Sequence, residues 1–409
     1  MLHSNLHAVL TVFGATLSLF STVGFLNAFG VFQDYYKTHT LRDRSESDIS
    51  WIGSVAIFLI YGGAPFSGFL VDRFGPRWLL LVGAVGQLVA VFMTSLCTQY
   101  YQFFLAQGIL LGASMCILTW PATAVVSRTL PKNRGLAMGI VLGGSSLGGL
   151  VWPIMIEQLL QNTTLGFGWT IRVVGFTMLA FLVIVCITVR EPVLLYESKS
   201  PISSDTEPAK VEPVSMPKPM KKKVEKAEVL ALVKNPVFIF LSLGITIATL
   251  GLFVPIFYLV PNAISRGLSR EVSFYALSAL NGASFLGRVI PGHLADVFGH
   301  YNVLIISVIG SGIVGFAWTA ASNLAGVFVI AVVYGFMSGV CLHMQGTAMG
   351  LLMGIVAIAT LIGTPIAGVI VSRHGYLAQS MYTGATMLVG GLLLVLARFH
   401  YDRRLLASV

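Results

Sequence analysis

Long, nearly uninterrupted apolar runs recur along this chain and limit what it can fold into. Two of them are Leu79–Leu96 and Leu377–Leu396, and each is close to the roughly 20 residues that a helix needs to cross about 30 Å of hydrocarbon. Because hydrocarbon offers no partner to a bare backbone group, spans of this length are helices. Only 10% of the 409 residues are charged, against about 25% in a soluble domain. The chain is therefore predicted to be an all-α membrane protein.

Twelve such spans can be counted. They are predicted at 8–31, 50–71, 77–96, 101–126, 136–157, 169–190, 236–260, 272–295, 302–321, 324–344, 347–371 and 377–397. The stretch 191–235 is rich in Pro, Glu, Ser and Lys, a composition that cannot bury enough apolar area to fold. We therefore expect a six-helix half at 1–190, a disordered cytosolic linker at 191–235 and a second six-helix half at 236–409.

The basic residues indicate the orientation of these spans. An even number of spans leaves both termini on one side, and most of the 25 Lys and Arg residues fall in segments on that side. Since positive residues favour the cytosolic side, both termini are expected in the cytosol. The sequon Asn162-Thr163-Thr164 then lies between spans on the outer face, which makes Asn162 a candidate for N-glycosylation.

An internal repeat relates the two predicted halves. GFLVDRFG at 68–75 ends the second span and GHLADVFG at 292–299 ends the eighth, so that matched positions lie 224 residues apart. Gly63 and Gly287 keep the same offset. Two halves related in this way indicate a parallel repeat with its axis along the membrane normal.

The segment 68–77, GFLVDRFGPR, resembles the loop 2–3 signature of the major facilitator superfamily, G-x-x-x-D-R-x-G-x-R. The resemblance implies the twelve-helix fold of that superfamily and a conformational latch for its outward-open state. Gly68 is expected to let two helices approach closely. The implied latch residues are Gly68, Asp72, Arg73, Gly75 and Arg77, with Gly292, Asp296 and Gly299 at the repeated positions.

Four further segments resemble the monocarboxylate porter group in forms typical of its fungal members. They are Leu130–Ser146, Ile49–Gly53, Gly287-Arg288 with Pro291-Gly292, and Gly363–Gly368.

The chain departs from the proton-linked lactate-type porters, which carry an Asp four residues before the Arg of span eight and a Lys in span one. Ser284 stands at the first place, and span one contains no Lys. The connection between spans ten and eleven is also shorter than its counterpart in the first half. These departures leave the substrate class open.

One ionisable residue falls near the middle of a predicted span. Arg288 precedes Asp296, at the span's end, by eight residues, or about 12 Å of helix. A charge at that depth is costly and is a functional candidate by default. We expect Arg288 to bind an anionic group of a substrate through charge-assisted hydrogen bonds; the alternative is a structural role in which it pairs with carbonyl groups.

Other polar residues in the spans are weaker candidates for substrate binding. In the superfamily, spans one, four, seven and ten line the cavity. The alternative for each candidate is an interhelical hydrogen bond. The candidates are Asn27, Gln107, Tyr258, Asn281 and His343.

The sequence thus favours a secondary active transporter of a small organic, monocarboxylate-like anion or an amphiphilic metabolite, acting by alternating access. The alternatives are an exporter of a fungal secondary metabolite made by a biosynthetic gene cluster and, in another class, a transport-incompetent sensor or regulatory relative. No Walker A sequence indicates an ATP site, and no enzyme, cofactor, metal or nucleic-acid partner is expected. We expect a monomer in the lipid bilayer, in the plasma membrane, that acts on a small-molecule substrate.

Overall fold

The computed structural model describes residues 2–130, 134–161, 165–190, 234–321, 323–339 and 349–401. Up to residue 190, its helices are α1 (Leu2–Ser21), α2 (Val23–Asn27), α3 (Phe29–Tyr35), η1 (Tyr36–Thr40), α4 (Glu46–Gly62), α5 (Ala64–Phe74), α6 (Pro76–Thr94), α7 (Tyr100–Phe103), η2 (Phe104–Leu110), α8 (Leu111–Thr129), α9 (Arg134–Gln161) and α10 (Gly166–Thr188). After the linker come α12 (Pro236–Leu252), α13 (Val254–Ser265), α14 (Arg270–Phe298), α15 (His300–Ala317), η3 (Trp318–Ala320), α16 (Leu324–Ser338) and α17 (Met349–Tyr401).

Twelve membrane spans can be assigned to these helices. Eight helical stretches are long and apolar enough to cross a bilayer, and the pair α4 and α5 passes the same test as one span bent by 53°. The shorter α16 is apolar, and α14 runs for 29 residues. Gly375, with φ of 78°, divides α17 into two helices. The prediction of an all-α protein with twelve transmembrane helices is confirmed.

Several spans are longer and less regular than predicted. The first runs from Leu6 to Thr40, beyond the predicted 8–31, and is broken where α2 and α3 begin. Helical hydrogen bonding continues past the hydrocarbon into the polar boundary, where charged side chains are tolerated. Asp34 and Arg270, which the apolar runs leave outside the spans, therefore lie in helices.

The internal repeat is visible in the backbone. Gly75 ends α5 with φ of 77°, and Gly299 ends α14 with φ of 88°. A side chain is strained in this region, whereas glycine adopts it readily. The same turn therefore follows both copies of the motif.

Helix crossings within the two halves also correspond. A Cβ on Gly112 of α8 would lie 2.7 Å from the Ala56 Cα of α4, and one on Gly335 of α16 would collide with the Leu280 carbonyl of α14, whose carbon would lie 2.8 Å away. Ala56 and Leu280 are 224 residues apart. Both crossings bring backbones into contact, which is how membrane helices pack at small residues.

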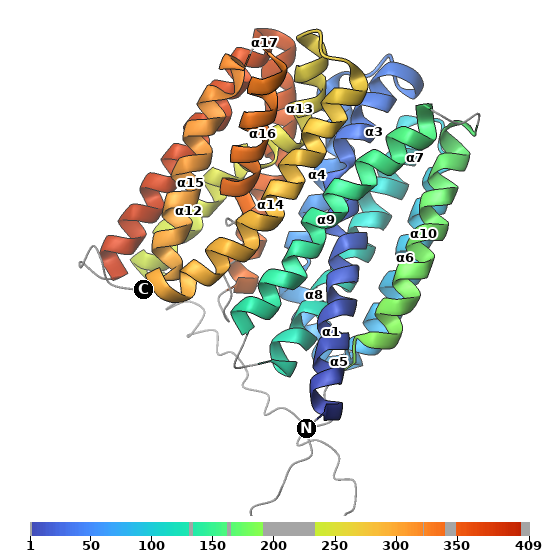
Figure 1. Ribbon diagram of the computed structural model, residues 1–409, viewed down its shortest axis with the longest axis vertical. Coiled ribbons are helices and arrows are strands. Elements are labelled where there is room, and N and C mark those ends of the chain that lie inside the picture. The colour runs from blue at the N-terminus through green and yellow to red at the C-terminus, as the bar shows by residue number, and fades with distance from the viewer. Residues whose placement is uncertain are drawn as a thin grey trace, which may run out of the picture.

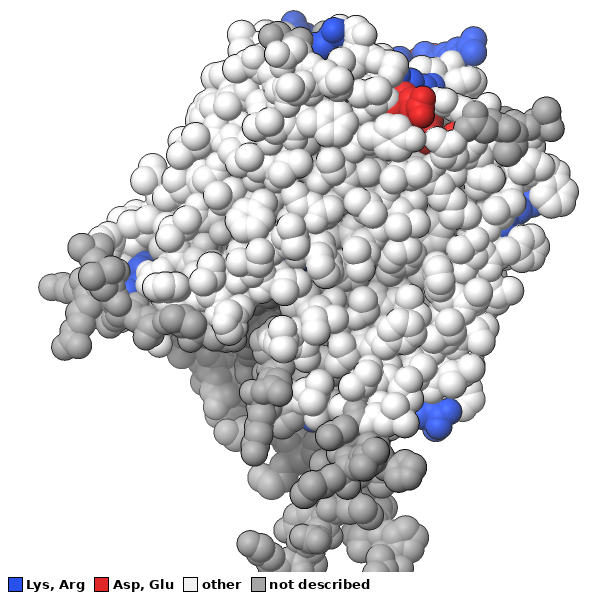
Figure 2. Space-filling model, viewed as in Figure 1, with Lys and Arg blue, Asp and Glu red and all other residues white. Residues whose placement is uncertain are grey.

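The surface fits a bilayer. The face in Figure 2 is uncharged across its middle, with basic residues towards both ends and at the edges of the view and acidic residues near one end only. Large apolar side chains such as Ile306, Val329 and Leu392 are about 60% exposed on the outside of the bundle. Exposure of so much apolar surface to water is unfavourable, whereas lipid would solvate it.

The two ends of the bundle are distinguished by the start of α1 and the end of α17, which lie towards the same end in Figure 1. We call this the terminal end, because α5 and α14 also end there, and we call the opposite end the far end. At the far end, α3, α4 and α9 pack against α13, α14 and α17.

Candidate functional site

Arg288 lies where α14 packs against α9. Its side chain is only 7% exposed, and its Nη1 donates hydrogen bonds to the Leu142 carbonyl oxygen at 2.6 Å and to the Ser145 hydroxyl. Tyr61 of α4 interacts with it electrostatically. Arg288 Nε has no hydrogen-bond partner, and no carboxylate among the described residues pairs with the guanidinium. A buried cation without a counterion is costly unless a ligand supplies the negative charge.

Two of the predicted polar residues, Asn27 of α2 and Asn281 of α14, contact the part of α9 that Arg288 contacts. Asn27 Nδ2 donates to the Ser145 carbonyl oxygen at 3.4 Å. The Asn281 side chain donates to the Leu277 carbonyl at 3.0 Å and lies directly over Gly149. Arg288, Asn27 and Asn281 therefore meet around 142–149 of α9, and we call these three residues with Ser145 the Arg288 cluster. Ser145 was not a predicted site residue.

The other predicted residues are not brought to this cluster. Gln107 accepts a hydrogen bond from the Tyr36 hydroxyl at 2.6 Å, between η1 and η2. Tyr258 is fully buried and donates to the Thr364 carbonyl at 3.3 Å. His343 lies outside the described residues. Gln107 and Tyr258 make the interhelical hydrogen bonds that the sequence left as their alternative role.

The far end is closed by contacts between helices from before and after the linker. Ser47 donates to the Pro365 carbonyl at 3.2 Å, and Ser54 is hydrogen-bonded to Thr364. Deeper in the bundle, the rings of Phe29 and Phe257 lie 5.1 Å apart. These three contacts form what we call the far-end seal.

Sequence reasoning missed an ion cluster beside this seal. Arg270, the first residue of α14, lies 2.8 Å from Asp34 of α3 and 3.1 Å from Glu157 of α9. One sequence feature could have indicated it: Asp34 and Glu157 each lie beside a long apolar run, with no other acid nearby. Which base they meet depends on how three distant segments pack.

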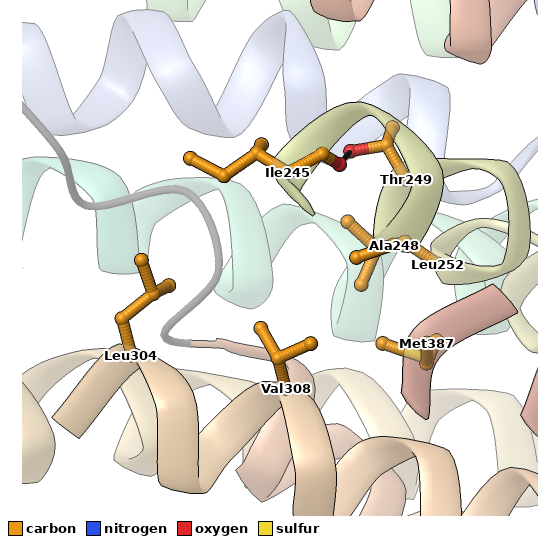
Figure 3. Close-up of a pocket in the computed structure, with 7 residues that line it drawn as sticks. All are labelled: Ile245, Ala248, Thr249, Leu252, Leu304, Val308 and Met387. Carbon is orange, nitrogen blue, oxygen red and sulfur yellow. Dashed lines mark hydrogen bonds between the residues drawn. The ribbon is translucent and has the colours of Figure 1, made fainter. Parts of the chain in front are cut away.

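Figure 3 shows a narrow pocket between α12, α15 and α17 that is a poor candidate for an anion site. Leu304, Val308 and Met387 line one part of it, and four residues of α12 line the rest. Its one hydroxyl, on Thr249, donates to the Ile245 carbonyl at 2.7 Å. No charged group is among the described residues that line this pocket, so they offer nothing to orient a carboxylate.

The predicted latch residues lie at the terminal end. Asp72 of α5 pairs with Arg128 of α8 at 3.4 Å, and Arg73 lies over the Phe74 ring. No described atom lies within 4 Å of a Cβ built on Gly68, so the close helix approach expected there is absent from this structure. Arg77 is exposed, and the side chain of Asp296 is not among those described.

The Asp72–Arg128 pair gives a prediction for stability. Both side chains are half exposed or more, and exposed pairs contribute about 0–1 kcal/mol. Asp72→Asn is therefore expected to change the free energy of unfolding by less than about 1 kcal/mol. Thermal unfolding of the purified variant beside wild type measures this, and a larger loss would mean that the pair holds α5 against α8.

A twelve-helix membrane bundle with a buried cation between its two sets of helices, paired with no carboxylate in the described part of the chain, is the arrangement of a secondary transporter. The comparisons with known proteins agree. The Major Facilitator Superfamily profile matches residues 8–345. A major-facilitator-type transporter of Aspergillus fumigatus is 48% identical over 97% of this chain and 93% of its own length.

Two further relatives are named as efflux proteins. The agnestins efflux protein of Paecilomyces divaricatus is 41% identical over 98% of this chain and 89% of its own length. The aspyridones efflux protein of Emericella nidulans is 37% identical over 94% of this chain and 76% of its own length. The chain belongs to the major facilitator superfamily and is a membrane transporter of small molecules.

Proposed function

We propose that this transporter exports a small organic acid, a fungal secondary metabolite, and that Arg288 binds its anionic group. The observation that carries the proposal is the Arg288 guanidinium, which is buried, has an unused Nε and lacks a counterion among the described residues. A carboxylate or an acidic enol of the cargo would supply the missing charge through charge-assisted hydrogen bonds. Asn27 and Asn281 would contact the neutral polar groups of the cargo.

The names of the relatives support export. Two relatives that each align with more than nine-tenths of this chain are named as efflux proteins for agnestins and aspyridones. Ser284 lies one turn before Arg288, at the place where lactate–proton symporters carry an acid. Without that acid, the Arg288 cluster lacks their proton carrier. The motifs of the monocarboxylate porter group then describe ancestry, and the proposed cargo is an acid other than lactate.

We also propose that 1–190 and 236–409 move as two halves around the Arg288 cluster, linked by 191–235. Loop charges favour a cytosolic terminal end, and the far-end seal supports a state that is closed towards the outside. An exporter loads its cargo in that state. In this orientation Asn162 is an outer glycosylation site, Asp72 and its neighbours form a cytosolic latch, and the protein acts as a monomer in the plasma membrane.

A metabolite comparison tests the proposed export. The gene is deleted in its host and restored either as wild type or as Arg288→Gln, and acidic metabolites are measured in cells and medium. We expect at least one acid to accumulate in the deleted cells, to fall in the medium and to be restored by wild type alone. If every acidic metabolite keeps its distribution on deletion, export of an acid is wrong. If only a neutral compound moves, the role of Arg288 is wrong.

A further inference from the structure

Three charged side chains meet at the far end, away from the Arg288 cluster. Arg270 lies between Asp34 and Glu157, and hydrogen-bonds to Glu157 Oε1 through its Nε. The side chains of Asp34 and Glu157 are 11% and 4% exposed. Arg270 belongs to the helices after the linker, whereas both acids belong to the helices before it. We call these residues the far-end triad.

The far-end triad has one negative charge in excess when both acids are ionised. Gln161 donates a hydrogen bond to Glu157 Oε1, but the other oxygen, Oε2, is buried without a partner. A carboxylate that is buried away from water without a compensating positive charge is energetically costly. A single bound proton would make the triad neutral, and the partnerless oxygen is a place to hold it.

The elements around the far-end triad carry further titratable groups. Glu46 on α4 interacts with Lys37 on η1, and these two charges offset one another. Glu271 on α14 is exposed and accepts a hydrogen bond from Tyr275 at 3.2 Å. The remaining titratable groups that face the triad are Tyr35 and Tyr376, which are uncharged at neutral pH, and His39, which faces Asp34.

We infer that the far-end triad is a proton-binding site and that a proton on Asp34 or Glu157 favours closure of the far end. The inference rests on the proposed movement of the two halves. When the far end opens, Arg270 moves away with its half and leaves both acids facing the outer solution, from which one takes a proton. Closure then returns Arg270 to a single carboxylate, so the closed triad is neutral. The closed triad then holds one proton taken from the outer side.

The test measures far-end closure against pH with no cargo present. The four native cysteines are replaced, and spin labels are placed on Thr98→Cys and Ser372→Cys, which are exposed positions on opposite halves. Distances between labels are measured on the full chain in lipid nanodiscs. In wild type, the ratio of closed to open molecules should rise as pH falls from about 8 to about 5, by up to about tenfold per pH unit for one linked proton.

Neutralising either acid should remove this response. Asp34→Asn and Glu157→Gln each leave one carboxylate for Arg270, so both should be closed across the whole pH range; if one fails to fold, the other decides. Glu271→Gln, which removes an adjacent exposed acid, should keep the wild-type response. A pH response that survives in both neutralised variants, or its absence in wild type, overturns the inference. So does equal closure by sodium ions at constant high pH, since the ligand would then be a metal cation.

Arg288→Gln separates this result from the proposed export. The Arg288 cluster is remote from the far-end triad, and the labels report closure without any cargo. We expect Arg288→Gln to keep the pH response while it loses export. If export by wild type were absent but the pH response present, the proposed cargo would be wrong and the proton site would stand.

Discussion

Arg288→Gln is expected to lower export of the cargo by about tenfold to a hundredfold, because a hydrogen bond to a charged group contributes about 1.5–3 kcal/mol. Glutamine keeps a polar side chain but loses the charge and the forked donors. Arg288→Lys keeps the charge alone and should retain part of the activity. Efflux from loaded vesicles containing equal amounts of each protein measures the change.

Stability separates a binding role of Arg288 from a structural one. The guanidinium is buried and has no counterion among the described residues, so Arg288→Met should leave the thermal midpoint of unfolding unchanged or raise it, since a buried charge is replaced by an apolar chain of similar size. A clear fall in the midpoint would mean that the bonds to Leu142 and Ser145 hold the fold. Arg172→Gln is the matched control: that arginine stacks on Trp169 in α10, and its loss should leave export intact.

Gly287→Ala is expected to cause a large loss of folded protein, because the added methyl group meets backbone atoms of a neighbouring helix. A Cβ there would collide with the Phe336 carbonyl of α16, whose carbon would lie 2.8 Å away. Backbone atoms cannot turn aside as a side chain can, so α14 and α16 must separate. Overpacking of this kind costs about 1–3 kcal/mol, or more. The yield of monodisperse protein in detergent and its thermal midpoint measure the loss.

Gly354→Ala is the control for this change. It lies inside α17, and the nearest atom to its added Cβ is in the Pro65 ring at 3.7 Å, an ordinary contact. Since alanine favours helix over glycine by about 1 kcal/mol, this variant should be as stable as wild type or slightly more so. Equal losses in both variants would show that the α14–α16 contact is not tight.

Much of the fold could be predicted because its cause is local. An apolar run such as 377–396 is itself the physical requirement for crossing a bilayer, so twelve spans follow from composition and length. The repeat was equally visible, since the turns at Gly75 and Gly299 need glycine. Arg288 could be nominated because a charge inside an apolar run is costly wherever its helix packs.

The rest of the site depends on packing between distant segments. Asp34 and Arg270 each resemble ordinary charges at the end of a span, and only the meeting of α3, α9 and α14 makes them a triad. The place of Gln107 against Tyr36 likewise follows from a π-helical segment, η2, in span four. No pattern of neighbouring residues indicates where either side chain finds its partner.

The far-end seal also has a thermal consequence. Apart from the Phe29–Phe257 contact, its bonds join a hydroxyl group to a carbonyl or to another hydroxyl, groups that water can solvate as soon as they part. Opening therefore exposes polar atoms together with hydrocarbon, and polar and apolar exposure change the heat capacity in opposite directions. The enthalpy of opening should accordingly vary little with temperature, so that the logarithm of the ratio of open to closed molecules should change almost linearly with inverse temperature.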